Sequence, residues 1–365
     1  MIKRRKTRNV KIGNIVIGGG HPVAIQSMAK TKTADIAKTI AQINELAKAG
    51  CEIVRVAVKD SADAKAIRQI KPSITIPLVA DIHFHWKLAI ESIESGADKI
   101  RLNPGNIYKK NEVAQVISAL KSAKKPLRIG LNSGSVEGSG VNSKLSMPKR
   151  LVLAATKYLH MVEKMKFFDT VISLKASDVQ ETVEAYRLMA NVCDYPLHLG
   201  VTATGLPFSG AIKSSIAVGT LLYEGIGDTI RISLTDSPTR EIEAARAILE
   251  ALKLRNFGPE IISCPTCGRC EVDLIAIVKE LEKKLSACPP LAGERYTLYA
   301  PTSIAVMGCV VNGPGEAKEA DLGIAFGKNQ GVLFKKGKLL RKVSYDRCVD
   351  ELLKLLSHCE RSEAI

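Results

Sequence analysis

The sequence predicts an α/β fold, a (β/α)8 TIM barrel followed by a small α+β domain. Eight short apolar runs alternate with amphipathic segments between residue 23 and about residue 255. Strands that alternate with helices form βαβ units with a parallel sheet, and eight such units match the ordinary length of this barrel, about 250 residues. A doubly wound sheet is the alternative, but no GxGxxG turn follows the first expected strand, which disfavours a nucleotide-binding fold.

The eight expected barrel strands are short runs rich in Val, Ile and Leu. They span residues 23–28, 53–58, 77–82, 99–102, 127–131, 170–174, 196–201 and 229–234. Between them, apolar residues recur at helical spacing, most clearly over residues 34–49, 85–95, 148–165, 178–189 and 238–252. Each of these helices is expected to pack its apolar face against the outside of the sheet.

A second domain is expected to begin near Gly258 and Pro259, because these residues interrupt the periodicity. The predicted domains are residues 1–255, which form the barrel, and residues 259–357. In the smaller domain we expect helices at 274–285 and 345–356, strands at 303–307, 322–326 and 331–334, a Pro-rich linker at 288–292 and a tight turn at 312–315. This pattern is typical of a small α+β unit.

The charge balance points to an anionic partner. The chain carries 53 Lys and Arg against 37 Asp and Glu, a formal net charge of +16. A nucleic acid is disfavoured, because only 4% of the residues are aromatic and the lysines are spread over helix surfaces instead of forming a stripe. No apolar run is long enough to cross a membrane, and the basic N-terminus lacks the apolar segment of a secretory signal, so we expect a cytoplasmic protein.

Cationic residues stand at the ends of five expected barrel strands. They are Arg55, Arg101, Arg128, Lys175 and Arg231. The C-terminal ends of the strands meet at one face of such a barrel, which is where active sites lie. Arg pairs with phosphate oxygens through two N–H groups and Lys acts as a point charge, so we expect a polyanion pocket of diphosphate size. Other polar side chains at the strand ends are Asp81, His83, Asn103, Asn132 and Ser233.

Five cysteines gather between residues 264 and 309, namely Cys264, Cys267, Cys270, Cys288 and Cys309. The pair in Cys264-Pro-Thr-Cys267 is compatible with zinc, a redox pair or an iron–sulfur site. A second pair for a four-cysteine zinc site is missing, and the turn at 312–315 can bring Glu316 beside Cys309. Three thiolates with one exchangeable carboxylate favour an iron–sulfur cluster. Two alternatives stay open: Cys270 as a ligand within CxxCxxC, and a phosphate- or pterin-binding barrel with a structural zinc domain.

Six segments of the chain are distinctive. They read ADIHFH, KIRLNPGN, RIGLNSGS, EGIGDTIRISL, CPTCGR and GCVVNGPGEA. Together they resemble the bacterial 4-hydroxy-3-methylbut-2-enyl diphosphate synthase family of the non-mevalonate isoprenoid pathway, from about residue 10 to residue 343. The resemblance implies a TIM barrel joined to a C-terminal domain with a [4Fe–4S] cluster. It also implies reductive ring opening of 2-C-methyl-D-erythritol 2,4-cyclodiphosphate, with two electrons delivered through the cluster.

The resemblance implies roles for individual residues. The implied cluster ligands are Cys264, Cys267, Cys309 and Glu316. The implied substrate-binding residues are Arg55, Arg101, Asn103, Arg128, Asn132, Lys175, Arg231 and Ser233. Catalytic roles are implied for Glu316, Asn312, Asp81 and His83, while Cys270 has no ligand role in the family pattern.

One position departs from the family pattern. Many members carry Glu in the loop after the seventh strand, where a carboxylate is thought to supply a proton, but this chain has Ala203 there. Water, His83 or another group would then supply the proton, or the step needs none from this position. The resemblance further implies a homodimer, in which the cluster domain of one subunit caps the barrel of its partner, and flavodoxin or ferredoxin as electron donor. The basic surface, including the N-terminal arm, could steer such an acidic donor.

Overall fold

The computed structural model describes residues 2–136, 141–287, 303–328 and 330–362. The chain divides into two compact units, Met1–Arg255 and Asn256–Ile365. The linker expected at residues 288–292, which includes Cys288, lies outside the described residues. In the part of the chain that the structure describes, no helix is both long and apolar enough to cross a membrane.

Eight parallel strands form the centre of the first unit. They are β3 (Ala24–Met28), β4 (Ile53–Val58), β5 (Leu78–Ile82), β6 (Lys99–Leu102), β7 (Leu127–Asn132), β8 (Thr170–Lys175), β9 (His198–Leu199) and β10 (Thr229–Ile230). Their order is β8-β7-β6-β5-β4-β3-β10-β9, and a parallel bridge between Ile172 and Leu197 joins the two ends of the series. This ring of strands confirms the predicted barrel.

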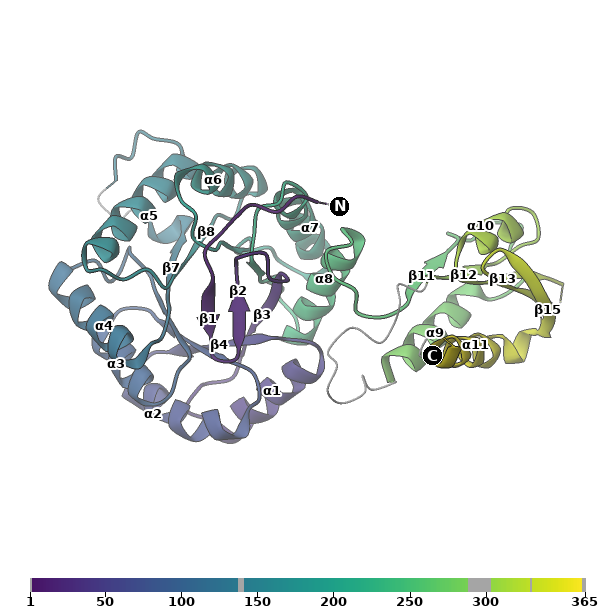
Figure 1. Ribbon diagram of the computed structural model, residues 1–365, viewed down its shortest axis with the longest axis horizontal. Helices are drawn as coiled ribbons and strands as arrows, with labels where there is room; N and C mark the ends of the chain where they lie inside the picture. The colour runs from purple at the N-terminus through teal and green to yellow at the C-terminus, as the bar shows by residue number, and fades with distance from the viewer. Residues whose placement is uncertain (1, 137–140, 288–302, 329, 363–365) are drawn as a thin grey trace. The chain divides into compact units, whose positions relative to one another are not determined.

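A helix follows each strand of the ring and lies on its outside (Figure 1). The helices are α1 (Ile36–Lys48), α2 (Ser61–Ile70), α3 (Trp86–Glu94), α4 (Lys110–Ala123), α5 (Met147–Lys164), α6 (Val179–Val192), α7 (Pro207–Tyr223) and α8 (Pro238–Ala251). Polar residues cap several helix starts; the Asp60 carboxylate, for example, accepts the backbone N–H of Asp63 in α2. One apolar face of each helix packs inward, as where α1 buries Ile43 and Leu46.

Strands β9 and β10 are shorter than the sequence predicts. The apolar runs at 196–201 and 229–234 suggest six-residue strands, but the two strands pair over two residues only. The reason lies in the hydrogen bonds of the following segment, because the backbone N–H of Leu234 is bound by the carboxylate of Glu241 and not by a neighbouring strand. Arg231 and Ser233 therefore belong to the loop after β10.

A β-hairpin precedes the barrel and is formed by β1 (Val10–Ile12) and β2 (Ile15–Ile17). Its apolar residues are buried in one cluster with Ala24, Ile53 and Val79, which lie near the starts of β3, β4 and β5. The hairpin therefore closes the N-terminal end of the barrel. Gly13 in its turn has a φ of +57°, which favours glycine. Three-residue strands show too little alternation to be recognised, and the sequence does not predict this element.

Three arginines of the N-terminal arm bind the barrel itself. Arg4 forms an ion pair with Asp228 at 3.0 Å, and Arg8 forms one with Asp194 at 2.8 Å. Arg5 donates hydrogen bonds to backbone carbonyl oxygens between α6 and β9. These contacts attach the N-terminal arm to the barrel.

The second unit contains a mixed sheet in the order β11-β12-β13-β14-β15. Its strands are β11 (Glu260–Ser263), β12 (Ser303–Met307), β13 (Leu322–Gly327), β14 (Gln330–Lys335) and β15 (Lys338–Ser344). The first three are parallel, and the last two add an antiparallel meander. Helices α9 (Leu274–Ala287) and α11 (Cys348–Ser362) pack on Ile304 and Val306 of β12, whereas α10 (Gly313–Glu319) packs on Ala305 and Met307. Because side chains alternate along a strand, these helices cover opposite faces of the sheet.

The turn predicted at residues 312–315 is instead the start of α10. The backbone N–H of Glu316 donates to the carbonyl oxygen of Asn312 at 3.2 Å, which is a helical hydrogen bond. Pro314 lies in the first turn, where its missing N–H removes no helical bond. Asn-Gly-Pro-Gly is typical of turns, but here it begins a helix and places Glu316 one turn inside it.

Candidate functional site

The structure places the five predicted cations in the interior of the barrel, but not all of them at strand ends. Arg128 is the second residue of β7 and Arg55 the third of β4, so the prediction that these two stand at strand ends is wrong. Arg55 lies in β4, Arg101 in β6, Arg128 in β7 and Lys175 in β8, while Arg231 follows β10. Burial lowers the pKa of Lys175 well below its ordinary value, and the charges of Arg231, Arg55, Arg128 and Arg101 lower it further. Since charges from four other segments of the barrel act on one amine, the five side chains point into one space.

Lys175 is buried there without a counter-ion. The residue is 6% exposed, and no carboxylate of a described residue forms an ion pair with it. Gly200 provides the room, because a Cβ at that position would lie 2.5 Å from the Lys175 Nζ. A buried ammonium without an anion is costly, so an anionic ligand would stabilise it.

Asp81 is a carboxylate among these arginines. It accepts a hydrogen bond from Arg101 at 2.9 Å and lies 3.5 Å from the Nε of Arg55. Burial alone would raise the pKa of Asp81, but Arg101 and Arg55 together outweigh it and hold the pKa well below its ordinary value. His83 is 43% exposed, and its Nε2 lies 3.7 Å from the same carboxylate. Asp81 is therefore ionised near neutral pH, where it orients arginines and has no proton to donate.

Arg128 has buried polar neighbours that sequence reasoning missed. Its Nη1 donates to the Gln26 Oε1 at 3.3 Å, while its Nε has no partner among the described residues. Lys99 is fully buried, and burial, followed by the charges of Arg128 and Arg55, lowers its pKa well below the ordinary value. The signal was available, because Lys99 and Arg101 stand two residues apart in a strand and so point to the same side.

His198 of β9 also lies inside the barrel. Its Nδ1 is 2.7 Å from the hydroxyl oxygen of Thr229, and its Nε2 has no partner within the described part of the chain. Burial, followed by the charges of Arg128 and Lys175, lowers the pKa of His198 well below its ordinary value. The imidazole is therefore neutral and adds hydrogen-bonding capacity without charge.

Basic groups outnumber acidic ones in this interior. The basic residues are Arg55, Lys99, Arg101, Arg128, Lys175 and Arg231, and the acidic ones are Asp81 and Glu241. Buried N–H groups of Gln26, Arg128 and Arg231 have no partner among the residues that the structure describes. A ligand with several anionic oxygens would supply both the missing charge and the missing acceptors. The arrangement is chemically suited to a diphosphate.

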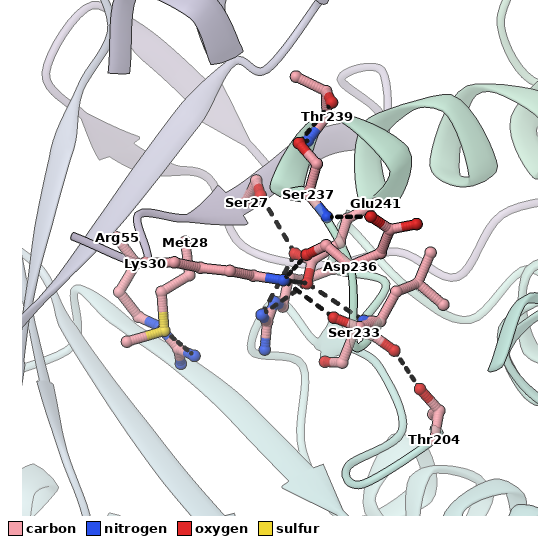
Figure 2. Close-up of polar contacts among 12 residues, drawn as sticks. Ser27, Met28, Lys30, Arg55, Thr204, Ser233, Asp236, Ser237, Thr239 and Glu241 are labelled. Carbon is pink, nitrogen blue, oxygen red and sulfur yellow. Dashed lines mark hydrogen bonds and ion pairs between the residues drawn. The ribbon is translucent and has the colours of Figure 1, made fainter. Parts of the chain in front are cut away.

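Glu241, another residue that the sequence did not reveal, binds the guanidinium of Arg231. Its two oxygens lie 3.1 and 3.2 Å from the Arg231 Nη2. Ser27 of β3 donates its hydroxyl to the same carboxylate at 3.2 Å, and Lys30 lies 3.4 Å away (Figure 2). Glu241 thus connects the loop after β10 with α8 and with the first strand of the barrel.

Two asparagines at the same end of the barrel shape its loops. The Asn103 side-chain oxygen accepts the backbone N–H of Gly105 at 3.1 Å and the Ser135 hydroxyl at 3.3 Å. Asn132 ends β7 and caps the short turn after it, again with Ser135. These contacts hold the loops after β6 and β7 together.

The loop after β9 contains no acidic side chain between Val201 and Gly205. Ala203 adopts a φ of +53°, and its methyl group carries no proton to transfer. The neighbouring Thr204 is buried and donates its hydroxyl to the backbone carbonyl of Ser233. This contact ties the loop after β9 to the loop that carries Arg231.

In the second unit, two predicted cluster ligands follow neighbouring parallel strands. Cys264 comes directly after β11, and Cys309 follows β12 with one residue between. The carboxyl ends of parallel strands meet at one edge of a sheet, and the backbone N–H of Gly308 accordingly lies 3.5 Å from the Cys264 Sγ. The sheet therefore brings the two segments together.

The environments of Cys267 and Cys309 favour thiolates. Hydrogen bonds from Arg269 lower the pKa of Cys267. Backbone N–H groups of Asn312 and Val311, at the start of α10, lower the pKa of Cys309. A thiolate is the form in which cysteine binds metals. Both thiols are therefore poised to act as ligands.

Glu316, the fourth predicted ligand, is exposed in the first turn of α10. Among the described residues, no three acidic, cysteine or histidine side chains lie close enough together to hold a single metal ion. A cluster of four irons keeps its ligands farther apart than one ion does. The donors present, three thiols and one carboxylate, fit an iron–sulfur cluster in their chemistry.

Cys270 has a different environment. Its thiol donates to the backbone carbonyl of Val272 at 3.2 Å and packs beside the apolar core of this unit. A Cβ on Gly308 would lie 2.4 Å from its sulfur, so the thiol sits tightly against the backbone. This packing agrees with a structural cysteine and disfavours Cys270 as a ligand.

Comparison with known families decides the identity. Residues 7–246 match the family model described as the GcpE TIM-barrel domain, and residues 260–358 match the one described as the GcpE protein C-terminal domain. The chain belongs to the GcpE family. This membership confirms the resemblance that its motifs indicated.

GcpE relatives match the chain over nearly its whole length. It is 51% identical over 365 residues, 100% of both chains, to the 4-hydroxy-3-methylbut-2-en-1-yl diphosphate synthase (flavodoxin) of Caldanaerobacter subterraneus subsp. tengcongensis. The proteins of the same name from Fusobacterium nucleatum and Thermodesulfovibrio yellowstonii are 49% and 51% identical, each over 97% of this chain and over 97% and 99% of their own. The GcpE barrel is also similar to a solved dihydropteroate synthase from Stenotrophomonas maltophilia, with a TM-score of 0.51 and 12% identity over 68% of this chain and 98% of that one. That likeness shows the fold alone.

Proposed function

We propose that this protein is a 4-hydroxy-3-methylbut-2-en-1-yl diphosphate synthase that opens the ring of 2-C-methyl-D-erythritol 2,4-cyclodiphosphate reductively. Residues 1–255 would bind the substrate, and residues 259–357 would hold the cluster. The observation that carries the proposal is the buried group of cations around Lys175, which outnumber the carboxylates among the described residues, in a family whose relatives bear this name. The anionic oxygens of a diphosphate would balance this excess of positive charge.

The barrel residues would bind and orient the substrate. Arg55, Arg101, Arg128, Lys175 and Arg231 offer donors from different sides, which fixes an anion in position as well as neutralising it. Asn103, Asn132 and Ser233 hold the surrounding loops. Asp81 keeps Arg101 and Arg55 oriented, so its part is indirect.

In the smaller domain, Cys264, Cys267, Cys309 and Glu316 would hold a [4Fe–4S] cluster. When bound, such a cluster supplies electrons one at a time at potentials that no side chain reaches. Glu316 would be the oxygen ligand among thiolates, and its side chain is exposed. Asn312 begins the same helix and would face the substrate beside it.

His83 is the side chain best placed to hold a proton for the departing oxygen. Its side chain is partly exposed, and its Nε2 lies 3.7 Å from a carboxylate oxygen of Asp81. Ala203 offers no proton at the position where many relatives have Glu. We therefore assign general-acid function to His83 Nε2, with water as the source that replenishes it.

Anaerobic turnover tests the proposed function. Protein reconstituted with iron and sulfide should convert the cyclodiphosphate to 4-hydroxy-3-methylbut-2-enyl diphosphate when reduced flavodoxin or a small neutral reductant supplies electrons. Added salt should slow the flavodoxin reaction more, because it screens attraction between a basic and an acidic protein. Colourless, zinc-containing protein without turnover would exclude this function and favour a barrel with a structural zinc domain.

We further propose a homodimer in which the cluster domain of one subunit covers the barrel of the other. Apolar side chains lie uncovered near both halves of the site: Phe84 follows His83, and Val310 and Val311 follow Cys309. Such exposed apolar groups beside a catalytic site indicate surfaces that another part of the assembly covers.

Co-expression of two impaired variants tests whether a cluster domain covers the barrel of its own chain or the barrel of the partner chain. At a cyclodiphosphate concentration well below KM, K175A should keep only about 1–10% of wild-type activity, and C309S should have none because its cluster does not assemble. If subunits cap one another, co-expressed mixed dimers contain one intact site, and activity should return to about a quarter of wild type for random pairing. Activity of correctly dimeric mixtures that stays at the level of K175A or below would show that each chain builds its own site.

A further inference from the structure

Glu241 is a buried carboxylate with no direct part in the site described above. It lies in the first turn of α8 and is 2% exposed. Both oxygens contact the Arg231 Nη2, and they also accept the Ser27 hydroxyl at 3.2 Å and the backbone N–H of Leu234 at 3.1 Å. With its oxygens occupied in this way, Glu241 acts on other residues and not on a ligand.

Arg231 depends on this contact for its orientation. It follows the last residue of β10, and its backbone N–H donates to the Leu199 carbonyl oxygen of β9 at 3.0 Å, which fixes the backbone but not the end of the long side chain. Glu241 holds one nitrogen of the guanidinium, Nη2, while the buried Nε has no partner among the described residues. The carboxylate therefore fixes one edge of the group and leaves another free for an acceptor.

Lys30 joins the same group of contacts (Figure 2). Its ammonium lies 3.4 Å from Glu241 and donates to the backbone carbonyl oxygens of Leu234, at 2.9 Å, and of Asp236. Glu241 and Lys30 thus hold the segment from Arg231 to Asp236 from two sides. The loop that carries the cation is fixed together with the cation itself.

We propose that Glu241 is a positioning residue that holds Arg231 in the orientation in which it binds the substrate's diphosphate. The identity of that ligand rests on the proposed function. Positioning and charge predict opposite effects of removing the Glu241 carboxylate on diphosphate binding. Removing a carboxylate from a cationic pocket raises its positive potential, which by itself strengthens anion binding; loss of positioning weakens it.

Two variants of Glu241 separate the effect of its side-chain length from the effect of its charge. E241Q removes the charge and keeps the size, and E241D keeps the charge and shortens the reach. Both should raise KM for the cyclodiphosphate about tenfold, with kcat within about threefold of wild type, and both should weaken binding of inorganic diphosphate in calorimetry by a similar factor. Glu243 provides the matched control, because it lies on the same helix, is 57% exposed and pairs with Arg240 at 2.7 Å. E243Q should leave both values unchanged.

A double-mutant cycle shows whether Glu241 acts through Arg231. In an R231Q background, adding E241Q should change diphosphate affinity by less than about twofold, because the group to be positioned is gone. If the role of Glu241 were merely structural, the effects of E241Q and R231Q on diphosphate affinity would add in full. E241Q would then lower the folded fraction in thermal unfolding, and KM would not rise selectively over a change in kcat.

Each outcome is decisive. Unchanged or tighter diphosphate binding by folded E241Q, or E241D equal to wild type, overturns the inference. If wild type binds inorganic diphosphate but does not turn over the cyclodiphosphate, the proposed function fails while the calorimetric comparison still decides the positioning role. Wild type that binds neither compound overturns both.

Discussion

Replacing Cys309 with serine should prevent assembly of a stable iron–sulfur cluster, whereas C270S should leave the cluster largely intact. The backbone N–H groups of Asn312 and Val311 lower the pKa of the Cys309 thiol, so this residue is prepared as a thiolate ligand. The Cys270 thiol instead donates to the Val272 carbonyl within the core. Anaerobic absorption near ~400 nm, with iron and sulfide analysis, measures the cluster in both variants.

The comparison controls for general damage to the domain. Serine keeps nearly the same size at both positions, so a packing defect would be at least as large at the more tightly packed Cys270. Circular dichroism should show that both apo-proteins keep their secondary structure. Equal loss of iron from C309S and C270S would show that the ligand assignment is wrong, and stoichiometric zinc in either protein would favour a structural zinc site.

Lys175 should affect stability and affinity in opposite directions. K175M removes a buried ammonium that has no ion-pair partner among the described residues, so the ligand-free protein should become more stable by about 1–2 kcal/mol, a rise in Tm of roughly 2–4 °C. The same change removes a charge-assisted contact to the diphosphate of about 1.5–3 kcal/mol, which should raise KM roughly 10- to 100-fold. Thermal unfolding and anaerobic kinetics measure the two effects.

The pH dependence gives this prediction a sign that can be checked. The folded-state pKa of Lys175 lies well below its ordinary value of 10.5, so folding disfavours the proton. The resulting penalty is full below the folded-state pKa and disappears as the pH rises to the unfolded value. The Tm advantage of K175M should therefore shrink at alkaline pH.

The exposed Lys157 of α5 serves as the control, since K157M should change neither Tm nor KM appreciably. Iron content should be normal in K175M. A loss of iron equal to that in C309S, or a fall in Tm at neutral pH, would mean that Lys175 is structural and not a ligand-binding cation.

The barrel could be predicted because its signals are local. Val, Ile and Leu runs alternate with helical periodicity, and the end of each run marks the face at which polar residues meet. That rule accounts for Lys175, which ends β8, but not for Arg55 and Arg128, which lie in the middle of β4 and near the start of β7. Lys99 does not follow from that rule, because it begins its run; only its two-residue spacing from Arg101 indicates that it points inward.

Other features depend on contacts that no local pattern contains. Glu241 lies on an ordinary amphipathic helix, and only the packing of α8 against the barrel brings it to Arg231 and Ser27. In the smaller domain, Asn312-Gly313-Pro314-Gly315 satisfies the rules for both a turn and a helix start. Packing of Ala317 against the sheet favours the helix.

The hairpin at residues 10–17 determines from which end of the barrel a ligand can reach the cations. Its buried side chains Val10, Ile12 and Ile17 close the barrel at the N-terminal end, so molecules reach the cations from the opposite end. Substrate and product then enter and leave through the same end of the barrel. Each product molecule, which keeps its diphosphate, has to depart along the path by which its successor arrives. Because the N-terminal end is closed, product must leave before the next substrate can enter. Product and substrate therefore compete for binding at the same cations.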